Sequence, residues 1–541
     1  MKSRLYAAVS GFEEKKTSYL LLAVSGALFS VGFTFKECWF FSWMFFTPLA
    51  ISVFFTNKTS KRVLSSLFCF FFVFYVCCYS WLISMYPLDF AGLGSLESIL
   101  VIALGLILIP LVHGTLMSFS IWLLNKLCEK CSFSVIRSLG VSFGYVLGEF
   151  LQGFGYLGFP WARMYVSQRG NIYNLQSAKL FGSYFITFIV VFFGCMTAQA
   201  LVSGKNRKKY ALTAALIFLL NFTFGVVCVK VTEMGYDKTS TVNVAALQGN
   251  ISSYEKWDSL QNSYERYLIL SEQAAKYCKD NGIDCDIALV PETAFPSTAV
   301  RVVDGTVTKG TKLLDVSALL SKTMSCPVLS GTFTQIDQSE YNSLVCVNSY
   351  GEILGVYNKQ KLVPFGEFVP YRSFISVIFP LLSDINMLSS DLAFGENQKP
   401  IDVSGIKTAC LICFDSVFGD CVREQIKNGG DIIAVSTNDS WYKRSKALEQ
   451  HAAHSVMRAI ENHRPLVRSA NTGISMIVEP TGKIVEQTEI LETSFIVGKL
   501  HKQNIFTLYT DCGDLTLYFS FAFFGVMSVW NVSKKIRRRA W

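Results

Sequence analysis

Residues 210–247 read YALTAALIFLLNFTFGVVCVKVTEMGYDKTSTVNVAAL, and they contain the change of pattern that decides the fold. Tyr210–Val231 is almost entirely apolar and reaches the roughly 20 residues that a helix needs to cross a lipid bilayer. Thr241–Leu247, ten residues later, alternates in the period of a β-strand, and charges are frequent from there on. The sequence therefore predicts membrane helices before this point and a mixed α/β domain after it.

Further apolar runs of spanning length lie on the N-terminal side, and one shorter run lies near the C-terminus. The eight runs are Thr17–Phe35, Trp39–Phe55, Val63–Tyr86, Leu100–Leu124, Val135–Phe154, Ala178–Val202, Tyr210–Val231 and Leu515–Trp530. We therefore expect a polytopic membrane protein with about eight transmembrane helices. Its parts are a seven-helix transmembrane domain (1–231), a mixed α/β domain (232–514) and a C-terminal transmembrane helix with a basic tail (515–541).

The composition agrees with this division. Charged residues make up 16% of the 541 residues, whereas an average soluble domain has roughly a quarter. Hydrophobic residues make up 51%, which excludes a disordered chain and an ordinary cytosolic enzyme. The 16 cysteines do not resemble a small disulfide scaffold, since many lie in apolar stretches where a cysteine acts as a small hydrophobe.

The basic residues predict the orientation in the membrane. They cluster in alternate loops and at both ends of the chain, at 2–16, 58–62, 126–130, 205–209 and 534–539. The positive-inside rule places these segments in the cytoplasm, so both termini are expected there and the α/β domain on the outer, periplasmic side. The same clustering explains the net charge of +9 without nucleic acid. The loop with Arg163, Arg169 and Lys179 breaks the pattern, either as a functional surface or as a tolerated exception.

Short apolar or alternating runs bounded by turn residues predict the strands of the α/β domain. They are Thr241–Leu247, Asp286–Val290, Pro327–Thr332, Glu352–Tyr357, Thr408–Ile412, Asp431–Val435 and Gly473–Glu479. Helical stretches between them include Ser259–Asn281 and Leu448–Asn462. Alternating strands and helices predict a layered α/β domain, in which ligands bind at the carboxyl ends of strands.

Three reactive side chains follow predicted strands: Glu292, Lys359 and Cys413. Together a carboxylate, an ammonium group and a thiol form a plausible catalytic set. Glu292 would deprotonate Cys413, and Lys359 would stabilise the thiolate and then an oxyanion. A thioester formed on Cys413 suits acyl transfer better than hydrolysis where water is excluded.

Other readings of the cysteines and histidines remain open at this point. Cys410 and Cys413 form a CxxC pair, which could be a redox pair or half of a zinc site. His451 and His454 lie on a predicted helix, and we expect them to be solvated or N-terminal helix residues and not metal ligands. No metal and no cofactor are predicted.

The most specific stretch is Lys359–Pro370, which reads KQKLVPFGEFVP. Supporting motifs are Gly158–Trp161, Ala246–Asn250 with Trp257, Ser436–Trp441, Arg464–Arg468 and Asn471–Gly473. With the ordered glutamate, lysine and cysteine, these motifs resemble the nitrilase superfamily. Over nearly the whole chain the layout is similar to the apolipoprotein N-acyltransferases of bacterial inner membranes.

The resemblance implies an αββα nitrilase-like sandwich that transfers an acyl chain in a ping-pong reaction. The donor would be a phospholipid, expected to be phosphatidylethanolamine, and the acceptor the S-diacylglyceryl-cysteine amine of an apolipoprotein. Glu292, Lys359 and Cys413 would be catalytic and Glu367 a second carboxylate near them. Trp257 and Trp441 correspond to aromatic residues along the lipid access path. A monomer is expected.

Two residues depart from the family pattern, because Phe414 and Asp415 stand where the family has tyrosine and glutamate. Phe414 lacks the hydroxyl, and Asp415 reaches one methylene less, so the geometry around the nucleophile is in question. The apolar stretch Phe374–Leu382 is either an arm that dips into lipid or a buried core helix. Two other functions stay open: a membrane-anchored amidase or nitrilase with a small C–N substrate, and a non-catalytic polytopic scaffold or transporter.

Overall fold

The computed structural model describes residues 15–55, 59–89, 92–129, 131, 134–204, 206–237, 239–252, 260–303, 306–309, 311–378, 391–396 and 399–539. The chain divides into two compact units. Unit 1 comprises Met1–Leu82, Val101–Val229 and Cys512–Trp541, and unit 2 comprises Ile83–Leu100 and Lys230–Asp511. Each unit is described by itself.

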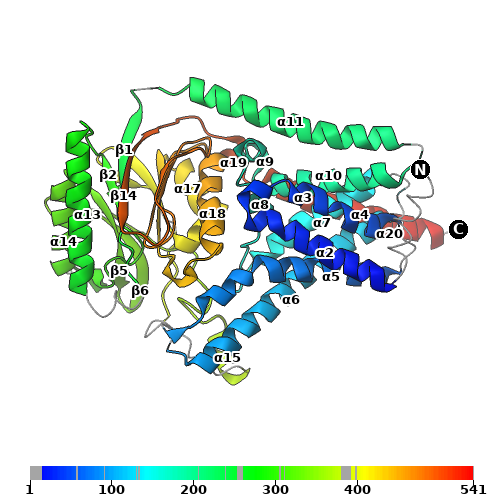
Figure 1. Cartoon of the computed structure of the whole chain (residues 1–541), viewed down its shortest axis with the longest axis horizontal. Helices are drawn as coiled ribbons and strands as arrows, with labels where there is room; N and C mark the ends of the chain where they lie inside the picture. The colour runs from blue at the N-terminus through cyan, green and yellow to red at the C-terminus, as the bar shows by residue number, and fades with distance from the viewer. Residues whose placement is uncertain are drawn as a thin grey trace. The chain divides into compact units, whose positions relative to one another are not determined.

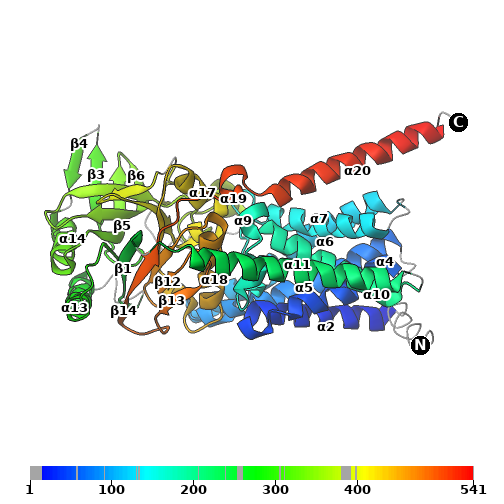
Figure 2. The ribbon, with the colours of Figure 1, turned by 90° about the horizontal axis from the view of Figure 1, so that it is seen from above.

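Unit 1 is built from helices (Figures 1 and 2). The longer ones are α2 (Lys15–Thr34), α4 (Thr47–Phe55), α5 (Ser60–Cys78), α6 (Ser95–Cys128), α7 (Ser134–Gln152), α10 (Tyr184–Val202), α11 (Arg207–Met234) and α20 (Leu515–Arg539). Short helical turns connect them: η1 (Lys36–Cys38), α3 (Phe41–Phe45), η2 (Ser80–Met85), α8 (Met164–Ser167), η4 (Ile172–Leu175) and α9 (Ala178–Phe181). Helix α2 packs on α5, and α10 packs on α7 and α4.

The polytopic membrane part is confirmed, although the helices differ in how well they fit a membrane span. Among the described residues, five helices are long and apolar enough: Ser60–Met85, Ser95–Cys128, Tyr184–Val202, Arg207–Met234 and Leu515–Ile536. Ser18–Thr34 and Phe41–Phe54 are shorter apolar helices, and they match two further predicted runs. Val135–Phe154 corresponds to α7, which carries the buried Glu149. That carboxylate accepts bonds from the Met164 amide (2.9 Å) and the Thr187 hydroxyl (2.7 Å), which satisfies a charge inside the bundle.

Unit 2 contains two β-sheets. The first has the order β14-β1-β2-β5-β3-β4, with β6 paired to β5 and β7, and the second has the order β13-β12-β11-β10-β9-β8. The strands of the first sheet are β1 (Thr241–Gln248), β2 (Ile287–Leu289), β3 (Thr298–Val303), β4 (Thr306–Lys309), β5 (Val328–Ile336), β6 (Ser339–Val347), β7 (Ile353–Asn358) and β14 (Ser494–His501). Those of the second are β8 (Ile401–Val403), β9 (Ile406–Ile412), β10 (Ile432–Thr437), β11 (Leu466–Ala470), β12 (Met476–Val478) and β13 (Ile484–Gln487).

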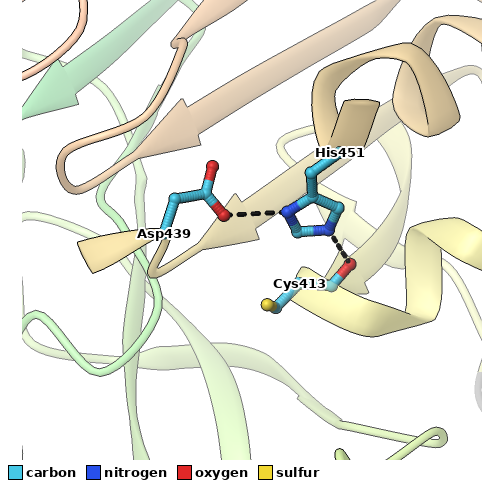
Figure 3. A group of neighbouring side chains, drawn as sticks. All are labelled: Cys413, Asp439 and His451. Atoms are coloured by element: carbon cyan, nitrogen blue, oxygen red, sulfur yellow. Dashed lines mark hydrogen bonds and ion pairs between the residues drawn. The ribbon is translucent and has the colours of Figure 1, made fainter. Parts of the chain in front are cut away.

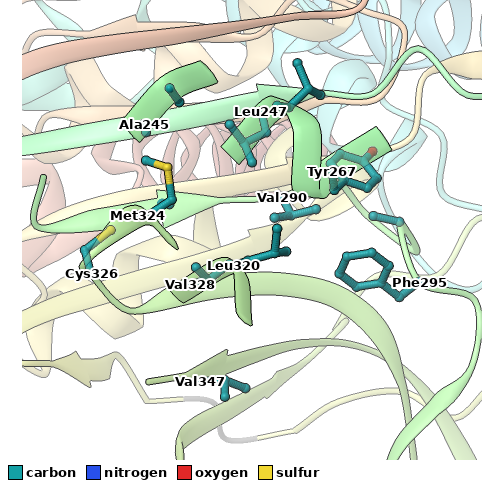
Figure 4. Close-up of a cluster of buried hydrophobic side chains, with 14 of the residues drawn as sticks. Ala245, Leu247, Tyr267, Val290, Phe295, Leu320, Met324, Cys326, Val328 and Val347 are labelled. Atoms are coloured by element: carbon teal, nitrogen blue, oxygen red, sulfur yellow. The ribbon is translucent and has the colours of Figure 1, made fainter. Parts of the chain in front are cut away.

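Strand β1 shows why the sheets stack in layers. Val242, Val244 and Ala246 point into the core between the two sheets. Ala245 and Leu247 point the other way, into a second core beneath helices α13 (Leu260–Asp280) and α14 (Thr311–Met324) (Figure 4). Because successive side chains of a strand face opposite sides, a strand that is apolar on both must be covered on both.

A third core lies between the second sheet and two helices, α17 (Gly419–Lys427) and α18 (Ala447–Asn462). The layers therefore run helix, sheet, sheet, helix, and the predicted αββα sandwich is confirmed. Each of the seven predicted strands overlaps an observed one, and the two predicted helices are α13 and α18. Strands β3, β4, β6, β8, β11, β13 and β14 and helices α14 and α17 were not predicted.

Candidate active site

Cys413 lies at the point where β9 ends and the short helix η5 (Cys413–Val417) begins. Its φ is 50°, in the left-handed region that side-chain-bearing residues rarely adopt. Such a sharp turn at a strand end is a strained conformation that the surrounding fold must hold, and strain of this kind gathers at functional sites. The residue is 6% exposed.

Glu292 follows β2, and its carboxylate is fully occupied by hydrogen-bond donors. Oε1 accepts bonds of 2.8 Å from Lys359 Nζ and 2.8 Å from Asn342 Nδ2. Oε2 accepts a bond of 2.7 Å from the Asn438 amide, which follows β10. The carboxylate is therefore held from three strands at once.

Lys359 follows β7 and lies between two carboxylates. Its Nζ is 2.8 Å from Glu292 Oε1 and 2.9 Å from the Glu367 carboxylate. Glu367 also accepts bonds from Asn342 Nδ2 (2.8 Å) and from the Val363 amide (2.9 Å). Asn342, on β6, thus bridges both glutamates, and it is a residue that the sequence patterns did not indicate.

The charges around the site set the protonation states of its groups. Burial by itself would raise the pKa of Glu292, but the charge of Lys359 and the hydrogen bonds outweigh it, and the pKa lies below its usual value. Burial would lower the pKa of Lys359, but Glu292 and Glu367 raise it well above the usual value. Burial and the charge of Glu292 raise the pKa of Cys413 well above that of a free thiol, although Lys359 acts in the opposite direction. At rest the site therefore holds a neutral thiol beside an ionised carboxylate, the state that a general base requires.

Asp415 connects the turn at Cys413 with the segment at Lys359. Its Oδ1 accepts bonds from the amides of Gln360 (3.1 Å) and Lys361 (2.7 Å). Its Oδ2 accepts bonds from the Ile412 amide (3.0 Å) and the Tyr357 hydroxyl (2.9 Å). The shorter side chain therefore still makes a complete set of contacts. Phe414 is buried, and its ring meets Phe418 edge-on, with centroids 5.3 Å apart.

His451 and His454 lie in the first half of α18, and both are fully buried, so the alternative that they are solvated was wrong. His451 Nδ1 lies 2.8 Å from Asp439 Oδ1, and its Nε2 lies 3.2 Å from the main-chain carbonyl oxygen of Cys413. Figure 3 shows that this oxygen, and not the sulfur, faces the imidazole. The ring therefore supports the backbone of Cys413 and is not placed to take the proton of its thiol.

The same three residues, Cys413, Asp439 and His451, have potential metal-ligand atoms close together. However, both Asp439 oxygens already have partners, because Oδ1 faces His451 and Oδ2 accepts a bond of 2.9 Å from Arg468. A metal would have to displace these contacts. The arrangement fits a structural network better than a metal centre.

Two further predicted site residues are the tryptophans expected along the lipid access path. Trp257 lies outside the described residues. Trp441 is partly exposed in the short helix η6 (Ser440–Tyr442). The next residue, Lys443, donates a bond of 2.7 Å to the Tyr86 carbonyl oxygen in the Ile83–Leu100 segment of unit 2. In the stretch Phe374–Leu382, the short helix α15 (Arg372–Ile378) exposes Phe374 and Val377, and residues 379–382 lie outside the described part.

Comparison with known proteins gives the family. Residues 25–196 match the model of the apolipoprotein N-acyltransferase N-terminal domain, and residues 243–505 match the carbon-nitrogen hydrolase model. The chain is 24% identical over 513 residues to the apolipoprotein N-acyltransferase of Geobacter metallireducens, covering 92% of both chains. It is 28% identical over 532 residues to that of Haemophilus influenzae, covering 94% of this chain and 93% of the relative. Among solved structures, Saccharomyces cerevisiae Nit3 of the nitrilase superfamily matches with a TM-score of 0.36 and 17% identity, over 48% of this chain and 90% of Nit3.

The two family models follow one another along the chain in the order of its membrane helices and its sandwich. The relatives are matched over almost their full length. The chain belongs to the apolipoprotein N-acyltransferase family.

Proposed function

We propose that this protein transfers an acyl chain from a phospholipid to the amino group of the S-diacylglyceryl-cysteine at the N-terminus of apolipoproteins. The proposal rests on the family, and one observation carries its chemistry: a buried carboxylate–ammonium–carboxylate array beside a thiol at a strained strand end. Such an array suits the formation and breakdown of an acyl-thioester.

In the first half-reaction Cys413 is the nucleophile. Glu292 takes the proton of the thiol as the sulfur attacks the ester carbonyl carbon of the phospholipid. Lys359 stabilises the negative charge on the former carbonyl oxygen. When the tetrahedral intermediate collapses, the C–O bond breaks and the lysophospholipid oxygen takes the proton back from Glu292. The acyl chain remains on Cys413 as a thioester.

In the second half-reaction the α-amine of the acceptor attacks the thioester carbon, and Glu292 takes a proton from the nitrogen. The C–S bond then breaks, an amide forms, and the proton returns to the Cys413 sulfur. Glu292, Lys359 and Cys413 are all nearly fully buried, which supports transfer to an amine over hydrolysis because little water reaches the thioester.

The roles of the surrounding residues follow from their contacts. Glu367 makes a second ion pair with Lys359, beside the one with Glu292. Asp415 positions the segment that carries Lys359, and Phe414 fills the space behind the turn. Trp257 and Trp441 would contact the lipid chains, as their family counterparts do.

The protein would act at the bacterial inner membrane as a monomer. Residues 1–231 and 515–541 would form the transmembrane part, and 232–514 the periplasmic catalytic domain, with both termini in the cytoplasm. Phosphatidylethanolamine is the expected donor. Reporter fusions after Val231 and at the C-terminus should report opposite sides of the membrane, and a result with both on one side would overturn this topology.

The direct test is to incubate the purified protein with a phospholipid whose acyl chain is radiolabelled. A labelled protein band that disappears in Cys413→Ala and on treatment with hydroxylamine is expected. Absence of label in the wild type, or equal labelling of Cys413→Ala, would contradict the thioester mechanism.

An amidase that acts on a small C–N substrate is the second candidate, favoured by the match of residues 243–505 to the carbon-nitrogen hydrolase model. Release of ammonia from small amides without labelling by phospholipid would favour it. A non-catalytic scaffold is disfavoured, since a buried thiol, an ionised carboxylate and an ammonium group together supply the nucleophile, base and oxyanion stabiliser of an acyl transfer.

A further inference from the structure

Three cysteines of unit 2 gather near the amino-terminal ends of the neighbouring strands β2 and β5, whereas Glu292 follows the carboxyl end of β2. Cys278 lies near the end of α13, Cys285 lies between α13 and β2, and Cys326 precedes β5. All three are free thiols, and Cys278 and Cys326 are 6% and 5% exposed. The proposed mechanism uses none of them.

Local structure brings Cys285 beside Cys278. The chain reverses at Gly282, whose φ of 64° suits glycine, and the Ile283 amide donates a bond of 2.9 Å to the Cys278 carbonyl oxygen. The residues that follow return toward the sheet and enter β2. Cys285 therefore lies against the last turn of the helix that carries Cys278.

Sheet pairing brings Cys326 to the other side of Cys285. Strands β2 and β5 are parallel neighbours with Ala288 opposite Val328, so the residues just before each strand lie side by side. Figure 4 shows Cys326 at the edge of the core, next to Met324 and Val328. The Cys285 thiol interacts with the thiols of both Cys278 and Cys326, and it also points toward the Ile287 carbonyl oxygen at 3.4 Å.

We propose that Cys285 is the shared member of a redox-active thiol cluster and forms a disulfide with either Cys278 or Cys326. The cluster would link α13 to the start of β2, or β2 to the start of β5. Among the described residues these three sulfurs do not form a compact metal-binding group, whereas Cys285 has a thiol neighbour on each side. A disulfide is therefore favoured over a metal.

The oxidant would be a protein or small-molecule disulfide, which the proposed periplasmic placement of unit 2 makes available. Cys285, the partly exposed member, attacks one sulfur of the oxidant, forms a mixed disulfide and releases one thiol. Cys278 or Cys326 then attacks the Cys285 sulfur, forms the internal disulfide and releases the second thiol. One external disulfide is thus reduced to two thiols while two cysteines lose two hydrogens.

The hydrogen bond with Cys278 by itself would lower the pKa of Cys285, but the hydrogen bond with Cys326 and burial outweigh it, and the pKa lies above that of a free thiol. Since the thiolate is the attacking species, formation of the internal disulfide should speed up as the pH rises.

The test uses the full-length protein in detergent, treated with oxidised glutathione or with a reductant. Remaining thiols are alkylated before digestion with trypsin. The enzyme cuts after Lys276, Lys279 and Arg301, so Cys278 and Cys285 leave on different peptides. Cys326 leaves on a peptide that also contains Cys346, and Cys346→Ala provides the matched control that removes this ambiguity.

We expect linked peptides joining Cys285 to Cys278 or Cys326 in the oxidised sample, and their loss after reduction. Cys285→Ser should lose both links, Cys278→Ser should keep only the link to Cys326, and Cys346→Ala should keep both. The oxidised protein should also melt at a higher temperature than the reduced one. Full alkylation of Cys285 in the oxidised sample, or a link between Cys278 and Cys326 that excludes Cys285, would overturn the proposal. The experiment measures peptide masses, so its result does not depend on whether the protein transfers acyl chains.

Discussion

Asp415 Oδ1 accepts a hydrogen bond of 2.7 Å from the main-chain amide of Lys361. Asp415 lies two positions after Cys413, and Lys361 lies two positions after Lys359. The same carboxylate accepts from the Ile412 amide at the end of β9. One side chain thereby ties together the strand ends that carry Cys413 and Lys359. This contact explains how Cys413 and Lys359, which are distant in sequence, keep one geometry.

Replacing Asp415 with asparagine should therefore impair both folding and catalysis. The amide group cannot accept from all four donors, and hydrogen bonds to a buried charge contribute about 1.5–3 kcal/mol each. We expect a loss of unfolding free energy of about that size. Because Lys359 would shift, we also expect thioester formation to slow on the order of 100-fold, the usual effect of a displacement of about 1 Å.

Asp420→Asn is the matched control, since Asp420 is exposed and lies 3.6 Å from the side chain of Lys361. Exposed pairs of this kind contribute about 0–1 kcal/mol, so its rate and melting temperature should stay close to wild type. Equal effects of the two substitutions would show that Asp415 does not position the lysine segment.

The roles of the two glutamates can be separated by comparing Glu292→Gln with Glu367→Gln. Glu292→Gln removes the general base, which usually contributes about 10²–10⁴-fold, and should reduce the rate of protein labelling by that factor. Glu367→Gln leaves the base in place and only weakens the hold on Lys359, so its effect should be smaller. Single-turnover labelling with radiolabelled phospholipid measures both. A greater loss of labelling rate in Glu367→Gln than in Glu292→Gln would indicate that Glu367, and not Glu292, is the general base.

Asp439 should make the stability of unit 2 depend on pH. Burial would raise its pKa, but Arg468 and His451 outweigh burial and hold the pKa far below the usual value. A carboxyl group whose pKa is lowered by folding stabilises the native state above its unfolded pKa, about 3.9, and loses this effect as the pH falls below it. The melting-temperature difference between wild type and Asp439→Asn should therefore be largest at neutral pH and shrink below about pH 4.

Asp402→Asn provides the comparison for this measurement. Asp402 is exposed and accepts a local bond from the Gly405 amide at 2.7 Å. The melting temperature of Asp402→Asn should match that of the wild type at every pH. A constant difference between wild type and Asp439→Asn across the same range would mean that the charge of Asp439 does not stabilise the fold.

The sequence was sufficient to single out Glu292, Lys359 and Cys413 because each follows a predicted strand, and ligands of α/β folds bind at the carboxyl ends of strands. Their contact with one another is confirmed for Glu292 and Lys359 by an ion pair, while their catalytic roles stay predictions. The αββα layering was also accessible, since β1 is apolar on both faces.

Other features depend on contacts between distant segments and leave no local pattern. Strand β14 pairs with β1 across about half of the chain, with Thr241 opposite His501. The alternative that His451 is solvated was wrong because almost the whole of α18 is buried, and polar side chains of this helix form internal networks. Asn342 lies in the polar first half of β6, and such a polar stretch is typical of a surface segment.

Asn342 offers the sharpest test of the electrostatics, because aspartate has nearly the same shape. Asn342 Nδ2 donates bonds of 2.8 Å to Glu292 and 2.8 Å to Glu367. In Asn342→Asp a third carboxyl group would face these two, and mutual repulsion should raise the pKa of Glu292. At neutral pH the rate of thioester formation should then fall below that of Asn342→Ala, which loses the two bonds but adds no charge.

The pH profile distinguishes this explanation from a simple packing defect. If repulsion between carboxylates causes the loss of rate, the acid limb of the pH–rate profile should move to higher pH in Asn342→Asp. The reason is that Glu292 must lose its proton to act as a base. Asn342→Ala should lose activity with little movement of that limb. Asn342→Asp with a wild-type rate and profile would mean that Asn342 does not set the charge state of Glu292, and that Lys359 and the Asn438 amide are sufficient to keep this carboxylate ionised.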